Sequence, residues 1–324
     1  MIIGMDDKPF VINSSMNIDH VHLNVTNLSK SLDFYKSVLG FRILKEDADS
    51  STVFLTAHPF YSGKEKEIHH PRSPLIVLTQ IKNNFDPKLL DKTKRTAGLY
   101  HFAILLPERE DLAAFLRNIK ENLDQHYYEG MADHAVSESI YIHDPDRIGI
   151  EIYRDRSPSE WIWNNNKVHM VTESLDVADL LTRHKTKTWK GMPAGTTIGH
   201  VHLHVANLNR ALNFYNGVLG LSHTATYPGA YFFAADRYHH HIGTNTWIGT
   251  DILPANINEQ YRPGLDHYAI SIPDNDEELA KLRNNIVNHG IAIENKTLDS
   301  DERFHDNTFF IYDPDGIKIQ LVIC

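Results

Sequence analysis

Polar and apolar residues alternate in short stretches, and each stretch is followed by a helical pattern. In HVHLNV, residues 20–25, every second residue is polar, which predicts a half-buried strand. From Leu28 to Leu39 apolar residues recur at helical spacing, and Gly40 stands where a helix commonly ends. Further strand patterns follow, and Asp-Pro-Asp at residues 144–146 and 313–315 is turn chemistry between the last two strands of a unit. The repeating unit is therefore predicted to be βαβββ.

The chain contains this unit four times. Residues 20–41 and 200–221 are identical at thirteen of 22 positions, at an offset of 180 residues. The stretch that begins at Leu99 resembles the one at Leu265, and the stretch at Ile140 resembles the one at Phe309. These matches place modules 1 to 4 at residues 17–80, 97–155, 197–252 and 264–324.

The predicted fold class is α+β, with the four modules forming two incomplete-barrel, cup-shaped domains of mixed sheet. Four strands and one helix cannot cover both faces of a sheet, so two modules must face each other. Along the chain we expect an arm at 1–16, domain 1 at 17–155, a connector at 156–196 and domain 2 at 197–324. The connector should contain a short helix near residues 175–182, and residues 57–73 should form a long loop.

Composition narrows the possible partners. The net charge of −10 gives no basic surface for nucleic acid, and no apolar run is long enough for a membrane span. The single cysteine, Cys324, allows no internal disulfide, and the first sixteen residues do not resemble a secretory signal, so we expect a cytoplasmic protein. The 21 histidines raise the question of a metal site, because imidazole is the commonest metal ligand.

Modules that open with His-x-His and close with Asp-Pro-Asp before a Glu or Gln resemble the vicinal oxygen chelate superfamily. That group includes glyoxalase I, the fosfomycin and bleomycin resistance proteins and the type I extradiol dioxygenases. The stretches GLYHFAILLP, DHAVSESIYIHDPDRIGIEIYRDR, IGHVHLHV and YHHHIGTNTW are similar to two-domain catechol 2,3-dioxygenase-type proteins of Gram-positive bacteria. The resemblance implies an extradiol dioxygenase that cleaves a catechol-type aromatic diol with O₂. It also implies an Fe(II) cofactor, with Mn(II) as an alternative that the same ligand types suit, and a homo-oligomer.

In this family two first-strand histidines and one last-strand glutamate hold the metal. Four histidines occupy the first-strand position, namely His20, His101, His200 and His267. At the last-strand position module 1 has Val77, module 4 has Gln320, and only module 2 has a glutamate, Glu151. The resemblance thus implies His101 and Glu151 as ligands. The third ligand is His20 if modules 1 and 2 share a cup, and His200 if modules 2 and 3 do.

The resemblance also implies catalytic residues, and they favour His200. An acid–base histidine is expected near the last strand of the module that supplies the first ligand, and module 3 has His240 there. Tyr141, ten residues before the glutamate, and His134 match the family's substrate-side tyrosine and its histidine partner. Strand alternation would put His239 and His241 on the face opposite to His240.

Two other functions stay open at this point. One is a glyoxalase-like metal-dependent isomerase or thiol transferase. Such sites typically have a second carboxylate, which Val77 and Gln320 do not supply. The other is a non-enzymatic protein that binds a small molecule such as an antibiotic. A complete set of histidine, glutamate and tyrosine argues against it.

Overall fold

The computed structural model describes residues 9–47, 50–57, 74–81, 95–183, 185–255, 262–295 and 308–324. Each module contains the predicted strand, helical segment and three further strands. The elements of modules 1 and 2 are β1 (Asn17–Val25), α1 (Leu28–Asp33), the π-helical turn η1 (Phe34–Val38), β2 (Arg42–Glu46), β3 (Thr52–Thr56), β4 (Ile76–Gln80), β5 (Gly98–Leu105), α2 (Arg109–Asn122), η3 (Gln125–Tyr127), β6 (Tyr128–Asp133), β7 (Ser137–His143) and β8 (Gly149–Asp155). The connector contains η4 (Pro158–Glu160), β9 (Trp163–Asn164), β10 (Lys167–Val168) and α3 (Val177–Arg183). Modules 3 and 4 contain β11 (Thr197–His204), α4 (Leu208–Leu212), η5 (Asn213–Val218), β12 (Ser222–Tyr227), β13 (Ala230–Ala234), β14 (Ile242–Asn245), β15 (Gly264–Ile272), α5 (Asp276–Asn288), β16 (Glu294–Asn295), β17 (Thr308–Tyr312) and β18 (Lys318–Ile323).

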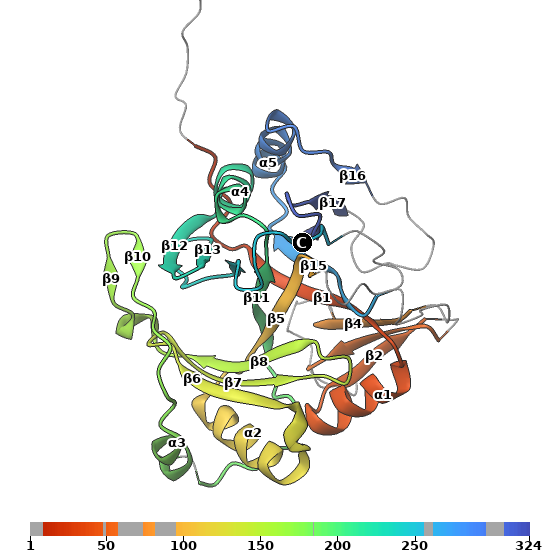
Figure 1. Cartoon of the computed structure of the whole chain (residues 1–324), viewed down its shortest axis with the longest axis vertical. Coiled ribbons are helices and arrows are strands. Elements are labelled where there is room, and N and C mark those ends of the chain that lie inside the picture. The colour runs from red at the N-terminus through yellow and green to blue at the C-terminus, as the bar shows by residue number, and fades with distance from the viewer. Residues whose placement is uncertain are drawn as a thin grey trace, which may run out of the picture.

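The strands form two mixed sheets of eight strands, so the predicted α+β fold class is confirmed. One sheet combines the two middle modules of the chain, 3 and 2, and we call it the inner sheet; its strand order is β12-β13-β14-β11-β5-β8-β7-β6. The other combines the first and last modules, 4 and 1, and we call it the outer sheet; its strand order is β16-β17-β18-β15-β1-β4-β3-β2. Figure 1 shows this arrangement as red and orange strands of module 1 beside blue β15, and green β8 with yellow-orange β5 beside teal β11.

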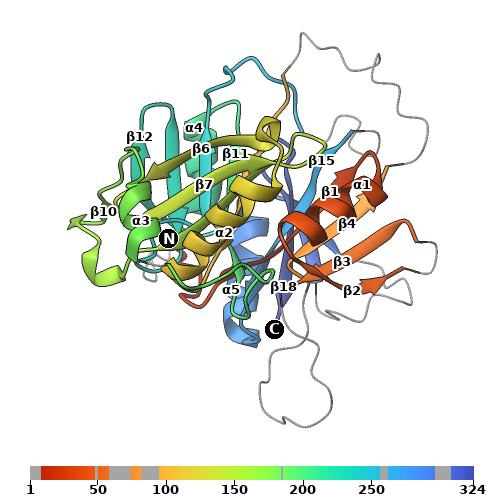
Figure 2. The ribbon, with the colours of Figure 1, turned by 90° about the horizontal axis from the view of Figure 1, so that it is seen from below.

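The two modules of a sheet join through their first strands, which run antiparallel: β11 beside β5 and β1 beside β15. A first strand pairs with the last strand of its own module on one side only, as β5 does with β8. Pairing the free edges of two first strands removes both edges from solvent. Seen from below, the two sheets lie side by side (Figure 2).

The sheets do not follow the two halves of the sequence, because each takes one module from either half. Each half nevertheless has contacts of its own. The Tyr35 hydroxyl of module 1 donates to Asp144 of module 2 at 3.2 Å, and the Tyr215 hydroxyl of module 3 donates to Asp313 of module 4 at 3.0 Å. The division into 17–155 and 197–324 therefore describes the repeat along the chain, not which modules share a sheet.

The connector crosses from module 2 to module 3 and includes the helix expected near residues 175–182, which is α3. Its hairpin β9–β10 packs on the inner sheet, where Trp161 and Val168 join a buried cluster with Phe232. Farther along, the connector touches module 1 at Gly191 and Gly40. A Cβ on Gly40 would lie 2.2 Å from Cα of Gly191, and both residues have positive φ, so only glycine fits this crossing.

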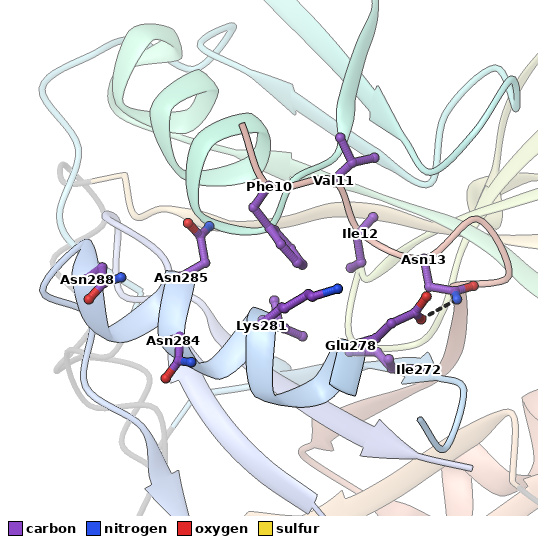
Figure 3. A pocket seen from close by; sticks show the side chains of 11 residues that line it. Phe10, Val11, Ile12, Asn13, Ile272, Glu278, Lys281, Asn284, Asn285 and Asn288 are labelled. Carbon is purple, nitrogen blue, oxygen red and sulfur yellow. Dashed lines mark hydrogen bonds between the residues drawn. The ribbon is translucent and has the colours of Figure 1, made fainter. Parts of the chain in front are cut away.

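The described part of the arm, residues 9–16, lies between modules 3 and 4. The Ile12 amide donates to the Gly220 carbonyl at 3.1 Å, and the Asn13 side chain donates to Glu278 of α5 at 2.5 Å. Phe10, Ile12 and Lys281 face a cavity of about 490 Å³ between the arm and α5 (Figure 3). Residues 1–8 and, apart from Ala57, the predicted loop at 57–73 lie outside the described residues.

Candidate metal centre and active site

The three predicted ligands lie on three neighbouring strands of the inner sheet. His200 is on β11, His101 on β5 and Glu151 on β8. In the register Ala103 pairs with His200 on one side and with Glu151 on the other, so these side chains share one face. Because the residue between them is an alanine, no long side chain separates His200 from Glu151.

The donor atoms of this triad, His101, Glu151 and His200, converge. Oε2 of Glu151 lies 3.0 Å from Nε2 of His101 and 3.1 Å from Nε2 of His200. All three donor atoms lie within 4.8 Å of one another. The Ser139 hydroxyl donates to the other oxygen, Oε1, at 2.5 Å and fixes the carboxylate. The side chains are nearly inaccessible, with 6% of His101 and 2% each of Glu151 and His200 exposed.

The charges of the triad suit a divalent cation. Burial alone would raise the pKa of Glu151, but the charges and hydrogen bonds of His200 and His101 hold it well below its usual value. Burial lowers the pKa of His200, and Glu151 opposes this only in part. One anionic oxygen and two imidazole nitrogens on one face are the ligand set of mononuclear non-haem Fe(II) oxygenases. The residues present therefore fit such an ion. His20, the alternative third ligand, lies on β1 of the outer sheet.

Tyr141 and His134 lie beside the triad as one hydrogen-bonded pair. Tyr141 on β7 pairs in register with Glu151, and its ring centroid is 5.6 Å from that of His101. Nδ1 of His134 lies 2.7 Å from the Val171 carbonyl oxygen, which can only accept, so this nitrogen carries the proton. Nε2 of His134 then accepts from the Tyr141 hydroxyl at 2.7 Å. Burial, together with the charge of Glu151, raises the pKa of Tyr141 well above its usual value.

His240 lies against the triad, with its ring centroid 4.1 Å from that of His200. The predicted alternation around it is wrong. Residues 239–241 form a bend before β14, which begins at Ile242, and alternation applies only to extended strand. His239 consequently points toward His240, and their Nδ1 atoms are 2.7 Å apart. Burial, with a smaller effect of His200, lowers the pKa of His240 well below its usual value, so its imidazole is neutral.

The residues behind His240 were not predicted from the sequence. Nε2 of His239 donates to Oδ1 of Asp155 at 2.7 Å, and the Tyr238 hydroxyl donates to Oδ2 at 2.8 Å. When His239 donates through Nε2 and carries no second proton, it accepts at Nδ1, and Nδ1 of His240 is then the donor between the two rings. Nε2 of His240 is then free to accept a proton. We call His240, His239 and Asp155 the relay. Alternation along β8 could have found Asp155, because it shares the face of Glu151.

Aromatic rings line the strand face next to His101. His202 lies 5.1 Å from His101, 5.3 Å from Tyr100 and 5.2 Å from Trp247, measured between ring centroids. Tyr100 is 40% exposed and Trp247 is 45% exposed, while His202 is 4% exposed. The rings thus lead from the surface toward the triad. Nε2 of His202 is buried without a hydrogen-bond partner in the part of the chain that the structure describes.

The matching position of the outer sheet has a different ligand set. His267 and His20 stand where His101 and His200 stand in the inner sheet, and their ring centroids are 5.7 Å apart. Gln320 occupies the place of Glu151 and lies 3.0 Å from Nε2 of His267 through its amide oxygen. The amide brings no charge, so this position lacks the anion that the triad has.

Comparison with known proteins finds a matching family and relatives of this chain. The family model described as Glyoxalase/Bleomycin resistance protein/Dioxygenase superfamily matches residues 17–152 and 197–321. A catechol-2,3-dioxygenase of Bacillus subtilis is 35% identical over 96% of this chain and 99% of its own length. A trivalent organoarsenical cleaving enzyme of a Bacillus species is 28% identical over 40% of this chain and 68% of its own length.

Two solved structures share the fold. A putative dioxygenase of Bacillus subtilis has a TM-score of 0.58 at 13% identity, covering 95% of this chain and 84% of its own. Glyoxalase I of Zea mays has a TM-score of 0.53 at 16% identity, covering 95% and 92%. Together with the triad, the similarity to the catechol-2,3-dioxygenase indicates a metal cofactor. Within the described residues, none of the helices has both the length and the apolar character needed to cross a membrane.

Proposed function

Because this chain belongs to the glyoxalase/bleomycin resistance protein/dioxygenase superfamily, we propose that it is an extradiol dioxygenase acting on a catechol-type diol with O₂. The observation that carries the proposal is the convergence of the triad, the Tyr141–His134 pair and the relay on one face of the inner sheet. These groups come from both halves of the chain, and only the pairing of modules 2 and 3 brings them together.

Fe(II), or Mn(II) in its place, would be held by His101, Glu151 and His200. Bound there, the ion supplies a Lewis acid that lowers the pKa of a chelated diol and a centre that can pass electrons between the diol and O₂. The burial of the triad would limit the access of water to the ion, since every triad residue is at most 6% exposed.

Proton handling belongs to the chain's own residues. His240 takes a proton at Nε2 from the incoming diol, and the hydrogen bond from its Nδ1 to His239 keeps the ring in the orientation that presents Nε2. Asp155 stabilises the positive charge that then develops, because its carboxylate accepts from His239. Acid–base assistance of this kind contributes about 10²–10⁴-fold to a rate.

Tyr141 acts on the other side of the site. Its hydroxyl stays protonated at neutral pH because its pKa is raised. The hydroxyl has a single proton, which it now donates to Nε2 of His134, so it can donate to a substrate oxygen by turning away from that nitrogen. The aromatic path of Tyr100, Trp247 and His202 favours a flat ring as substrate, because such rings pack edge to face or offset against one another.

A direct test is O₂ uptake by the Fe(II)-loaded protein on addition of catechols, followed by the yellow absorption of the ring-opened product. We expect wild-type turnover, and none for Glu151→Gln, which removes the anionic ligand while keeping the size of the side chain. If the metal-loaded wild type neither consumes O₂ nor changes a panel of catechols, the proposal is wrong.

The glyoxalase-like alternative has less support. In module 3 the residue equivalent to Glu151 is Gly243, which pairs with His202 in the parallel register. No second carboxylate therefore enters at that position. The function as a non-enzymatic binding protein is not favoured by any feature of the site. A cytoplasmic location and a homo-oligomeric state stay predictions.

A further inference from the structure

The two central strands of the outer sheet have the same irregularity in their pairing register as the two central strands of the inner sheet. In β11 and β5, His202 pairs with His101, and the next pair is Leu203 with Leu99. In β1 and β15, His22 pairs with His267, and the next pair is Leu23 with Leu265. Each sheet therefore has one extra residue on the second strand, a β-bulge.

The bulge residue is Tyr100 in the inner sheet and Asp266 in the outer one. A bulge turns its side chain toward the neighbouring residue, and here the Tyr100 ring lies 4.9 Å from the His101 ring. In the same way Oδ1 of Asp266 lies 2.6 Å from Nδ1 of His267. The outer sheet therefore has no carboxylate at the position of Glu151, where Gln320 stands, but it has one on the bulge residue Asp266.

This carboxylate meets two imidazoles. Donor atoms of His22, Asp266 and His267 all lie within 4.8 Å of one another, and the rings of His22 and His267 are 4.9 Å apart. Nε2 of His22 is hydrogen-bonded to the Thr79 hydroxyl at 2.7 Å, and the described residues offer its Nδ1 no hydrogen bond. His267 is 7% exposed, and the other two residues are partly accessible, so an ion could enter.

A neutral His267 ring has fewer N–H donors than the acceptors that it faces. Its Nδ1 faces the Asp266 carboxylate and its Nε2 faces the Gln320 amide oxygen, and both oxygens are acceptors. A neutral imidazole has a single N–H, so it can satisfy only one of them. With the proton on Nδ1, that nitrogen donates to the carboxylate, and Nε2 meets the Gln320 oxygen without a proton. A divalent ion that replaces the Nδ1 proton leaves the single N–H on Nε2, where it can donate to Gln320.

We propose that His22, His267 and Asp266 form a second metal site, which binds a borderline divalent ion of the Zn(II) and Co(II) class. Two imidazoles and one carboxylate, with water completing the shell, are a ligand set that such ions accept. The site is separate from the triad, because its three residues lie on β1 and β15 of the outer sheet.

One nearby charge opposes the ion. Nζ of Lys318 lies 3.9 Å from Oδ1 of Asp266 and 4.6 Å from the centre of the Phe310 ring. This ammonium is beyond hydrogen-bonding distance and partly exposed, so it competes with the ion through charge without filling the site. Replacing Lys318 by methionine should therefore tighten binding, by about ten-fold for a like charge removed at this range.

The experiment is equilibrium dialysis of metal-free full-length protein against Co(II), with bound metal measured by elemental analysis and the Co(II) absorption spectrum. We expect two ions per chain for the wild type. Asp266→Asn should weaken one site by at least ten-fold and leave the other, since even residues that only orient ligands change metal affinity by about 10–100-fold. Asp266→Asn should also keep catechol turnover, whereas Glu151→Gln should keep the outer site and lose turnover.

Each outcome decides one proposal separately. One ion per chain that is lost in Glu151→Gln and kept in Asp266→Asn overturns the second site and leaves the dioxygenase proposal standing. One ion per chain that depends on Asp266 but not on Glu151 supports the second site and overturns the dioxygenase proposal. An affinity of the outer site that is unchanged in Lys318→Met contradicts the placement of the ion beside Asp266. His267 would then carry two protons and satisfy both acceptors without a metal.

Discussion

Gly199 precedes the ligand His200, and a methyl group there would collide with Tyr153. An ideal Cβ on Gly199 lies 1.7 Å from the Tyr153 hydroxyl oxygen, 2.8 Å from Cζ and 3.1 Å from Cε1. Tyr153 is fully buried, its ring lies 5.0 Å from that of His200, and its hydroxyl is 3.0 Å from that of Tyr238. Gly199→Ala must therefore displace either the tyrosine or the strand that positions His200.

The expected cost has two parts. Overpacking a well-packed interior costs about 1–3 kcal/mol. Moving Tyr153 away from Tyr238 leaves a buried hydroxyl without its partner, which costs about 1–3 kcal/mol more. We therefore predict that Gly199→Ala lowers the free energy of unfolding by about 2–6 kcal/mol, and that the folded fraction has reduced metal affinity because His200 shifts.

Urea unfolding followed by circular dichroism measures the effect, and a double variant sharpens it. Tyr153→Phe removes the oxygen that lies 1.7 Å from the new methyl but leaves Cζ at 2.8 Å, so it should restore part of the loss in the Gly199→Ala background. Gly217→Ala is the matched control, because a Cβ there meets nothing within 4 Å. The reasoning fails if Gly199→Ala unfolds within about 0.5 kcal/mol of the wild type, or if the two substitutions at 199 and 153 are additive.

Three further predictions concern the site and its support. Tyr141→Phe should lower turnover about 10²-fold with unchanged metal content, measured by O₂ uptake and elemental analysis, and a retained rate would remove the hydroxyl from the reaction. His239→Phe should lower kcat about ten-fold with little change in KM, because His240 loses the acceptor that orients it, and an effect on KM alone would contradict this role. Although burial opposes it, the hydrogen bond from Arg109 holds the pKa of Glu138 below its ordinary 4.5. A depressed carboxyl pKa stabilises the fold above the unfolded-state pKa, and this stabilisation is lost as pH falls through the folded-state pKa. Glu138→Gln should thus cost about 2 kcal/mol at pH 7 and nothing at low pH, measured by urea unfolding across pH 3–7, and a pH-independent cost would refute the ion pair as its source.

Much of the fold could be predicted because the chain carries four copies of one pattern. The module bounds drawn from the repeat nearly coincide with the strands, as with β1 beginning at Asn17 and β4 ending at Gln80. The choice of His200 over His20 depended on which modules carry the expected catalytic residues. Only modules 2 and 3 together contain the full set of expected ligands and catalytic residues. The register of β11 and β5 then places these side chains on one face.

What the sequence could not give depends on local departures from regular strand. Residues 239–241 were expected to alternate, but they bend, and the bend turns His239 toward His240. The bulges at Tyr100 and Asp266 are set by the pairing of two distant strands, which no local pattern reveals. The partner of His134 is a carbonyl of the connector, at Val171, so its tautomer also depends on a contact between segments remote in sequence.

The nested pairing of the modules sets an order in which the sheets can close as the chain is synthesised. Modules 2 and 3 follow one another, so the inner sheet can complete itself once β14 has left the ribosome. Strand β1 is made early, yet its partner β15 belongs to the last module, and until then the edge of β1 is open. The catalytic centre would therefore form first, while the edge of β1 that pairs with β15 is still unpaired. Mutations that destabilise module 4 should therefore cause aggregation through the unpaired edge of β1 before they cause loss of the catalytic centre.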